Sequence, residues 1–377
     1  MKRLLLTAMT ALLLSVGTAW AASLEDGETA YQRGDYAIAL KVFRALAAQG
    51  NADAQFNLGT MYREGRGVTQ NYAEAAKWFR LAAAQGDAGA KDSLGVMYRE
   101  GLGVTQNYAE ALKWSILAAA QGNAIAQTNL GLMYGEGLGV TQNYAEALKW
   151  YRLAAAQGFA GAQNILGVMY REGLGVTQSY AEALKWYRLA AVQRDAGAQT
   201  NLGLMYAEGR GVMQNYAEAL KWFRLAVAQG DAGAQYNLGV MYAQGQGVGQ
   251  DYAQALKWYR LAAAQGDAGA QYNLGVMYAQ GQGVAQDYAE AVRSSRLAAA
   301  QGLAGAQYNL GWMYAQGQGV PQDYIRAYMW FNLGSSSGNA DAVKNRDLLA
   351  TRMTPQQIAQ AQKMARDCQQ RKFKGCD

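Results

Sequence analysis

The sequence predicts an all-α fold in which paired helices stack into an α/α solenoid. Glycine recurs every 36 residues, and whole segments of sequence recur with it. Each recurring segment holds two helical patterns separated by turn-forming residues. A period of this length is typical of helix-turn-helix units that bury their apolar faces on one another. The eight periodic glycines are Gly59, Gly95, Gly131, Gly167, Gly203, Gly239, Gly275 and Gly311.

The first helix of each repeat carries an apolar stripe and ends at a glycine turn. Leu58, Met61 and Tyr62 have the i, i+3, i+4 spacing of one helix face. Gly59 lies inside this helix, where glycine costs about 1 kcal/mol relative to alanine. Its recurrence predicts that a second helix backbone approaches too closely there for a Cβ. Gly65 and Gly67 suit the turn. A phosphate loop would need a preceding strand and a following G-K-[ST], and the sequence has neither.

The second helix begins at a capping box and carries a periodic tryptophan. Asn71 is the expected N-cap and Glu74 the expected N3 partner. The tryptophan lies six residues after Tyr72, and we interpret it as part of the core rather than as a ligand-stacking residue. The seventh repeat has Ser294 in this position, which predicts locally weaker packing. The predicted core tryptophans are Trp78, Trp114, Trp150, Trp186, Trp222 and Trp258.

The repeat pattern A-x-x-x-L-G-x-x-Y-x-x-G-x-G-V, followed by A-x-x-W-x-x-x-A-A-x-x-G, resembles the Sel1-like repeat, a relative of the tetratricopeptide repeat. The resemblance covers residues 52–339 as eight units. It implies a right-handed superhelix whose concave groove holds a protein or peptide. Solenoids need terminal caps, so we expect a tetratricopeptide-like helix pair at 22–51. A second helical cap with a basic, disulfide-closed tail is expected at 340–377.

The N-terminus has the features of a signal peptide at residues 1–21. Lys2 and Arg3 precede an apolar run, and Ala19-Trp20-Ala21 fits a cleavage site. The run is shorter than the ~20 residues that span a bilayer, and no later segment is apolar enough to do so. No cysteine follows the cleavage site for lipid attachment. We therefore expect a periplasmic or secreted protein with no transmembrane segment in the mature chain.

The two cysteines and most of the basic charge lie in the C-terminal tail. Cys368 and Cys376 are expected to form a disulfide in an oxidising compartment. The net charge is +6, but Lys2 and Arg3 contribute to it, and residues 343–377 hold eight Lys/Arg and three Asp. The body between them is nearly neutral, which argues against nucleic-acid binding. The tail could touch anionic lipids or cell-wall polymers.

The residue types argue against catalysis. The chain has no histidine, the residue that acid–base and nucleophilic catalysis most often uses. Two cysteines without histidine cannot form a four-ligand zinc site, and G-x-S-x-G and S-x-x-K are absent. Some relatives have been labelled β-lactamases, but their repeat cysteines are missing here. We predict no enzyme activity, catalytic residue, metal or cofactor. The alternatives are a peptidoglycan- or polysaccharide-binding module and an envelope hydrolase.

The partner site is predicted from positions that change while the repeat frame does not. The residue three before the periodic glycine varies in the first five repeats and is tyrosine in the last three. By resemblance to tetratricopeptide units, this position faces the concave groove. Tyrosine and tryptophan are enriched among interface hot spots. The predicted contact residues are Tyr236, Tyr272, Tyr308 and Trp312. The alternative is recent duplication that carried the tyrosines along.

Overall fold

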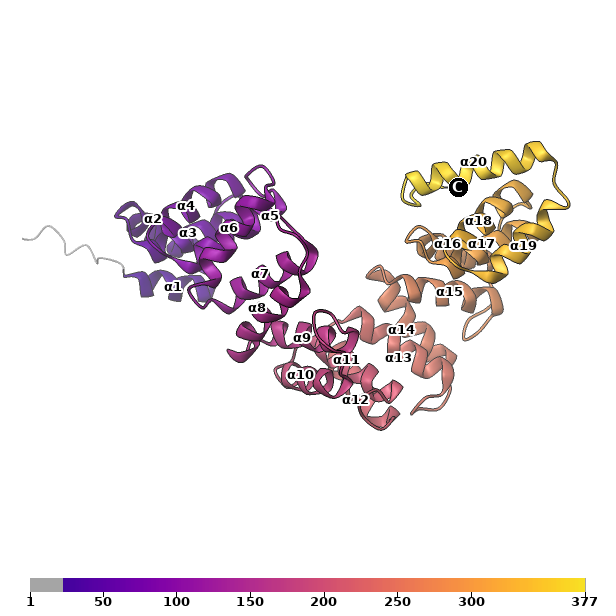
Figure 1. The fold of residues 1–377 in the computed structure, drawn as a ribbon, viewed down its shortest axis with the longest axis horizontal. Coiled ribbons are helices and arrows are strands. Elements are labelled where there is room, and N and C mark those ends of the chain that lie inside the picture. The colour runs from indigo at the N-terminus through magenta and orange to yellow at the C-terminus, as the bar shows by residue number, and fades with distance from the viewer. Residues whose placement is uncertain (1–22, 377) are drawn as a thin grey trace, which may run out of the picture. The chain divides into compact units, whose positions relative to one another are not determined.

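The computed structural model describes residues 23–376 (Figure 1). The expected signal peptide at 1–21 lies outside these residues. The described chain forms twenty helices and no strand, which confirms the predicted all-α solenoid of paired helices. Its contacts divide it into two compact units, and the division falls within helix α9. The first unit runs to Ala162 and includes Leu174–Thr177, and the second holds Gln163–Gly173 and the chain from Gln178 onward.

Every repeat contributes one odd-numbered and one even-numbered helix. The first unit contains α1 (Leu24–Arg33), α2 (Tyr36–Ala48), α3 (Ala52–Glu64), α4 (Tyr72–Ala84), α5 (Ala88–Glu100), α6 (Tyr108–Ala119), α7 (Ala124–Glu136) and α8 (Tyr144–Ala156). Helix α9 covers Ala160–Glu172. The second unit continues with α10 (Tyr180–Val192), α11 (Ala196–Glu208), α12 (Tyr216–Val227), α13 (Ala232–Gln244), α14 (Tyr252–Ala264), α15 (Ala268–Gln280), α16 (Tyr288–Ala299), α17 (Ala304–Gln316), α18 (Tyr324–Ser336), α19 (Ala340–Ala350) and α20 (Pro355–Gln370).

The core of each unit is shared between successive repeats. In the second unit, Phe223 of α12 clusters with Leu238 and Met241 of α13, the first helix of the next repeat. In the first unit, Phe79 of α4 clusters in the same way with Leu94 of α5. Each repeat therefore leaves one apolar face for its neighbour to cover, as a solenoid requires.

The periodic glycine accommodates an aromatic ring from the paired helix. A Cβ on Gly203 would lie 2.6 Å from Cε1 of Phe223, a ring that is 1% exposed. The close neighbour is thus a side chain, which corrects the prediction of a second backbone at this point. In the second repeat the ring is replaced by Ser115, and a Cβ on Gly95 would lie 2.8 Å from its Oγ.

The repeat tryptophans lie at the edge of the core and pack against its clusters, as Trp78, Trp150 and Trp258 do. All six are half-buried, whereas the residue that follows each of them is buried. Adjacent residues point in directions about 100° apart on a helix, so only one of the two can face the paired helix. Trp114 packs against the edge of the core cluster that α4 and α5 share. The buried residues that come directly after the tryptophans are Phe79, Ser115, Tyr151, Tyr187, Phe223 and Tyr259.

The helix ends match the predicted signals with one exception. The Asn71 side chain accepts a hydrogen bond from the Glu74 backbone N–H at 3.0 Å. The Glu74 carboxylate binds Lys77, so only half of the expected capping box forms. Gly65 takes the left-handed conformation at the end of α3, with φ of 70°. Gly67 also has positive φ, and a Cβ there would lie 2.8 Å from the Tyr36 carbonyl oxygen. The turn therefore packs on the preceding helix pair.

The C-terminal tail is closed by a disulfide between Cys368 and Cys376, with Sγ atoms 2.04 Å apart. Helix α20 starts with a complete capping box formed by Thr354 and Gln357. Its apolar side packs on α18, where Trp330 is only 2% exposed. Ser294, which takes the tryptophan position in the seventh repeat, is buried. Within residues 23–376, the helices are too short or too polar to cross a membrane.

We predict that Gly203→Ala lowers the free energy of unfolding by about 1–3 kcal/mol, because the new Cβ displaces the buried Phe223 ring. Gly95→Ala is the matched control. The Ser115 hydroxyl can rotate away, and alanine improves helix propensity by about 1 kcal/mol, so the control should be nearly neutral. Urea unfolding followed by circular dichroism measures both. Equal losses in the two variants would show that the ring is not the constraint.

We further predict that replacing Cys368 and Cys376 together with serine weakens the C-terminal cap by about 2–3 kcal/mol, from the loss of loop-closure entropy. Hydrogen exchange should then be faster in α20 and unchanged in α11, which serves as the internal control. Protection in α20 equal to that of the unmodified protein would contradict a stapling role for the bond.

Candidate functional site

The candidate site lies on the surface formed by α13, α15, α17 and α19, which we call the first-helix face. Two clefts of the second unit open on this face, one on each side of Trp312. Trp312 belongs to α17, lines both clefts and is 43% exposed. A large aromatic side chain left this exposed between two hollows is available for contact with a partner.

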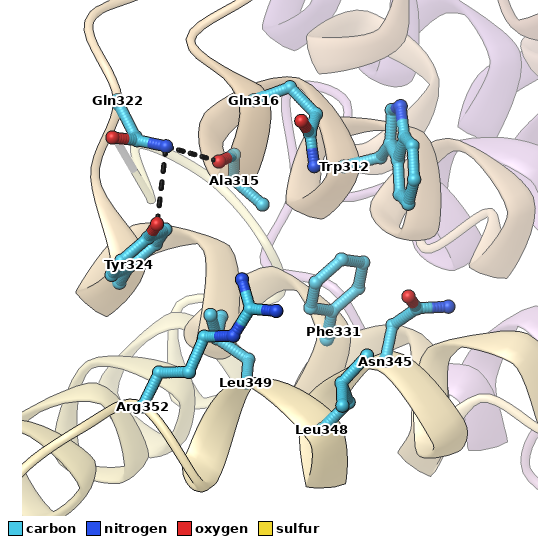
Figure 2. A pocket seen from close by; sticks show the side chains of 10 residues that line it. All are labelled: Trp312, Ala315, Gln316, Gln322, Tyr324, Phe331, Asn345, Leu348, Leu349 and Arg352. Atoms are coloured by element: carbon cyan, nitrogen blue, oxygen red, sulfur yellow. Dashed lines mark hydrogen bonds between the residues drawn. The ribbon is translucent and has the colours of Figure 1, made fainter.

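The terminal cleft, between α17 and α19, encloses about 380 Å³ (Figure 2). Phe331, Leu348 and Leu349 supply apolar walls. Arg352 extends its guanidinium into the cleft from the side opposite Trp312. The cleft is lined by Trp312, Ala315, Gln316, Gln322, Tyr324, Phe331, Asn345, Leu348, Leu349 and Arg352.

The turn that borders the terminal cleft is held by one side-chain amide. Gln322 Nε2 donates to the backbone oxygen of Ala315 at 2.8 Å and to the Tyr324 hydroxyl at 3.3 Å. Both bonds are drawn in Figure 2. The same arrangement recurs in other repeats, for example from Gln286 to Ala279 and Tyr288. This rim is therefore a fixed part of the repeat.

The inner cleft, between α15 and α17, encloses about 400 Å³. Val276, Met313 and the ring of Tyr272 give it an apolar character. All of its lining residues are uncharged. They are Tyr272, Gly275, Val276, Ala279, Gln280, Tyr288, Asn309, Trp312, Met313 and Gln318.

The four predicted contact residues have different surroundings. Tyr272 and Trp312 line the inner cleft, whereas Tyr236 and Tyr308 line neither cleft. The Tyr236 ring lies 5.9 Å from that of Tyr259, and a Cβ on Gly269 of the next repeat would come within 2.9 Å of it. Burial raises the pKa of Tyr236, as does the nearby charge of Asp267. The tyrosines therefore pack successive repeats together, in addition to any role in binding.

Several lining residues were not predicted, either because they lie outside the repeats or because they are the same in every repeat. Leu348, Leu349 and Arg352 belong to the C-terminal cap, where no period distinguishes a groove position from a solvated one. Tyr288 and Tyr324 begin the second helices and are invariant parts of the repeat frame. A further sequence signal agrees with this surface: the fourth residue after the periodic glycine changes from arginine in several early repeats to alanine in the last three, and Ala279 and Ala315 line the two clefts.

Some of the equivalent positions of the first unit are charged, namely Asp92, Arg63 and Arg99. Asp92 accepts a hydrogen bond from Asn129 Nδ2 at 2.8 Å, and burial raises its pKa despite this bond and the nearby charges of Arg99 and Arg63. Arg99 also pairs with Glu100. The continuous run of tyrosines beside alanines is thus a feature of the last repeats.

Four of the glutamates that end first helices form ion pairs with neighbouring arginines: Glu64, Glu100, Glu172 and Glu208. Burial would raise the pKa of Glu64, but hydrogen bonds from Tyr31 and Arg63 and the charge of Arg66 bring it below the ordinary value. A general acid at neutral pH needs a raised pKa instead. Among residues 23–376, the His, Cys, Asp and Glu side chains form no group that could hold a metal ion.

Comparison with known proteins identifies the repeat. The Sel1 repeat model matches residues 52–87, 90–123, 124–159, 160–193, 196–231, 232–267, 268–303 and 304–339. No curated protein matches the chain significantly.

Two solved structures resemble the chain over most of its length. A Sel1 repeat protein from Oxalobacter formigenes is 37% identical, with a TM-score of 0.61, over 82% of this chain and 90% of that one. A protective antigen present in uropathogenic Escherichia coli strains is 34% identical, with a TM-score of 0.52, over 94% and 84%. The periodic glycines, the helix pairs and these matches agree, and the chain belongs to the Sel1 repeat family.

Proposed function

We propose that this protein is a non-enzymatic scaffold of the bacterial envelope that binds a protein or peptide on the first-helix face of its second unit. Sel1 repeat proteins commonly serve as protein–protein interaction scaffolds. The observation that carries the proposal is the position of Trp312, which stands exposed between two clefts whose walls combine apolar and polar side chains.

The surroundings of Trp312 favour a macromolecular partner. Tryptophan and tyrosine bury a large area on binding at low entropic cost, and they dominate the energetics of many interfaces. The clefts are open hollows of about 380 and 400 Å³. Each can accept a side chain of a partner that continues along the face. Tyr272 extends this surface over the preceding repeat, and Tyr236 and Tyr308 support it.

Export to the periplasm or the cell exterior is part of the proposal. The bonded pair Cys368–Cys376 is consistent with an oxidising compartment. The N-terminal sequence has the charge, apolar run and cleavage motif of a signal peptide. Together they favour a location where envelope proteins assemble.

Binding of a cell-wall polymer is a second candidate, favoured by the basic tail. Arg366, Lys372 and Lys374 are exposed and would attract anionic polymers through charge. Such attraction is screened as salt concentration rises, whereas contact through Trp312 depends mainly on apolar burial. A partner that is released by moderate salt would favour the tail, and one that persists would favour the first-helix face.

We predict that Trp312→Ser abolishes capture of the partner from envelope fractions of the source bacterium while helicity and melting temperature stay nearly unchanged. The reason is that the substitution removes the exposed ring shared by both clefts. Leu261→Ser is the matched control, because Leu261 is also 43% exposed but lies on the second helix α14. Undiminished capture by the Trp312 variant, or equal loss in the Leu261 variant, would refute the site.

A further inference from the structure

We propose that the terminal cleft binds a carboxylate of the partner and that Arg352 is the residue that holds it. The inference rests on the proposed scaffold function and names the chemistry that the scaffold recognises. The ligand is an extended peptide in which an acidic residue lies about three positions from an apolar one.

The positive charge of Arg352 has no anionic partner among residues 23–376. It is the only charged residue that lines either cleft. Its guanidinium forms no hydrogen bond or ion pair with any residue of 23–376, and it extends into the cleft in Figure 2.

The acidic side chains of α19 and of the turn before α18 either form ion pairs with other arginines or lie far from Arg352. Asp323 pairs with Arg326 at 2.6 Å, and Asp347 pairs with Arg346 at 2.8 Å. Asp341 lies at the other end of α19, about 16 Å along the helix from Arg352 at 1.5 Å per residue. These carboxylates leave the guanidinium of Arg352 available to a ligand.

The side chains around the guanidinium determine which anion fits. Arg352 is exposed. The cleft beside it is lined by apolar groups such as Phe331 and by the amides of Gln316 and Asn345, which can donate further hydrogen bonds to an anion. The planar guanidinium binds a carboxylate through two parallel hydrogen bonds. Phosphorylated ligands are recognised by clusters of arginines, and the terminal cleft has a single one. A carboxylate is therefore the better match.

The distance between the two clefts sets the number of residues between the apolar and the acidic side chain of the peptide. The inner cleft is uncharged and lies between α15 and α17, and the terminal cleft lies between α17 and α19. Packed helices are about 8–10 Å apart, and an extended chain advances about 3.3–3.6 Å per residue. A peptide that crosses Trp312 would place an apolar side chain in the inner cleft and the acidic one about three residues away at Arg352.

Synthetic peptides with one leucine and one glutamate in a glycine-serine background provide the test, with the spacing of the two residues varied around three. The full-length protein should bind most tightly at a spacing of about three, and replacing glutamate by glutamine should weaken binding about tenfold or more. In Arg352→Gln this difference should disappear. Arg352→Glu should reverse it, so that the peptide with lysine in place of glutamate binds better.

Arg366→Gln is the matched control, because it removes a positive charge from the exposed face of α20 and should leave peptide binding unchanged. Three results would overturn the inference: no peptide is retained, the Arg352→Gln variant keeps the preference for glutamate, or a phosphoserine peptide binds better than the glutamate one. If Trp312→Ser abolishes capture of the natural partner while Arg352→Gln does not, the scaffold function stands and the carboxylate assignment fails.

Discussion

The fit of a buried side chain against the periodic glycine is the contact on which each repeat depends. A Cβ at Gly203 would overlap the ring of Phe223, so the two helices of the repeat can adopt their observed separation only because the glycine has no side chain. That separation places Phe223 in the core shared with α13. The exposed side of the first helices then carries the residues that vary, including Trp312.

A buried glutamine fixes the distance between successive repeats. Gln199 is 3% exposed, donates to the Ala191 carbonyl of the preceding repeat at 3.1 Å and accepts from Gln229 at 2.9 Å. A buried amide left without partners would be costly, so both neighbours must keep their positions. The same bonds recur at Gln271 in α15. These bonds hold α11 and α15 at a constant position relative to the helices before and after them.

The sequence was most informative where the repeat period amplifies a signal. The helix pairs, the left-handed Gly65 and the N-cap Asn71 could all be predicted, because each recurs with its neighbours. The side chain that fills the core could not, because Trp222 and Phe223 are both aromatic and only the packed geometry shows which one faces α11. The cap residue Arg352 occurs once, so its place in a cleft depends on how α19 packs against α17 and α18.

Site-specific photo-crosslinking tests most directly whether a partner occupies the first-helix face. A photoreactive phenylalanine analogue would be introduced at Trp312 and, in a separate protein, at the equally exposed Leu261. Irradiation of the native envelope should then give a discrete crosslinked product from position 312 and none from position 261. Crosslinking from position 261 alone would place the partner on the second helices and would contradict the proposed site.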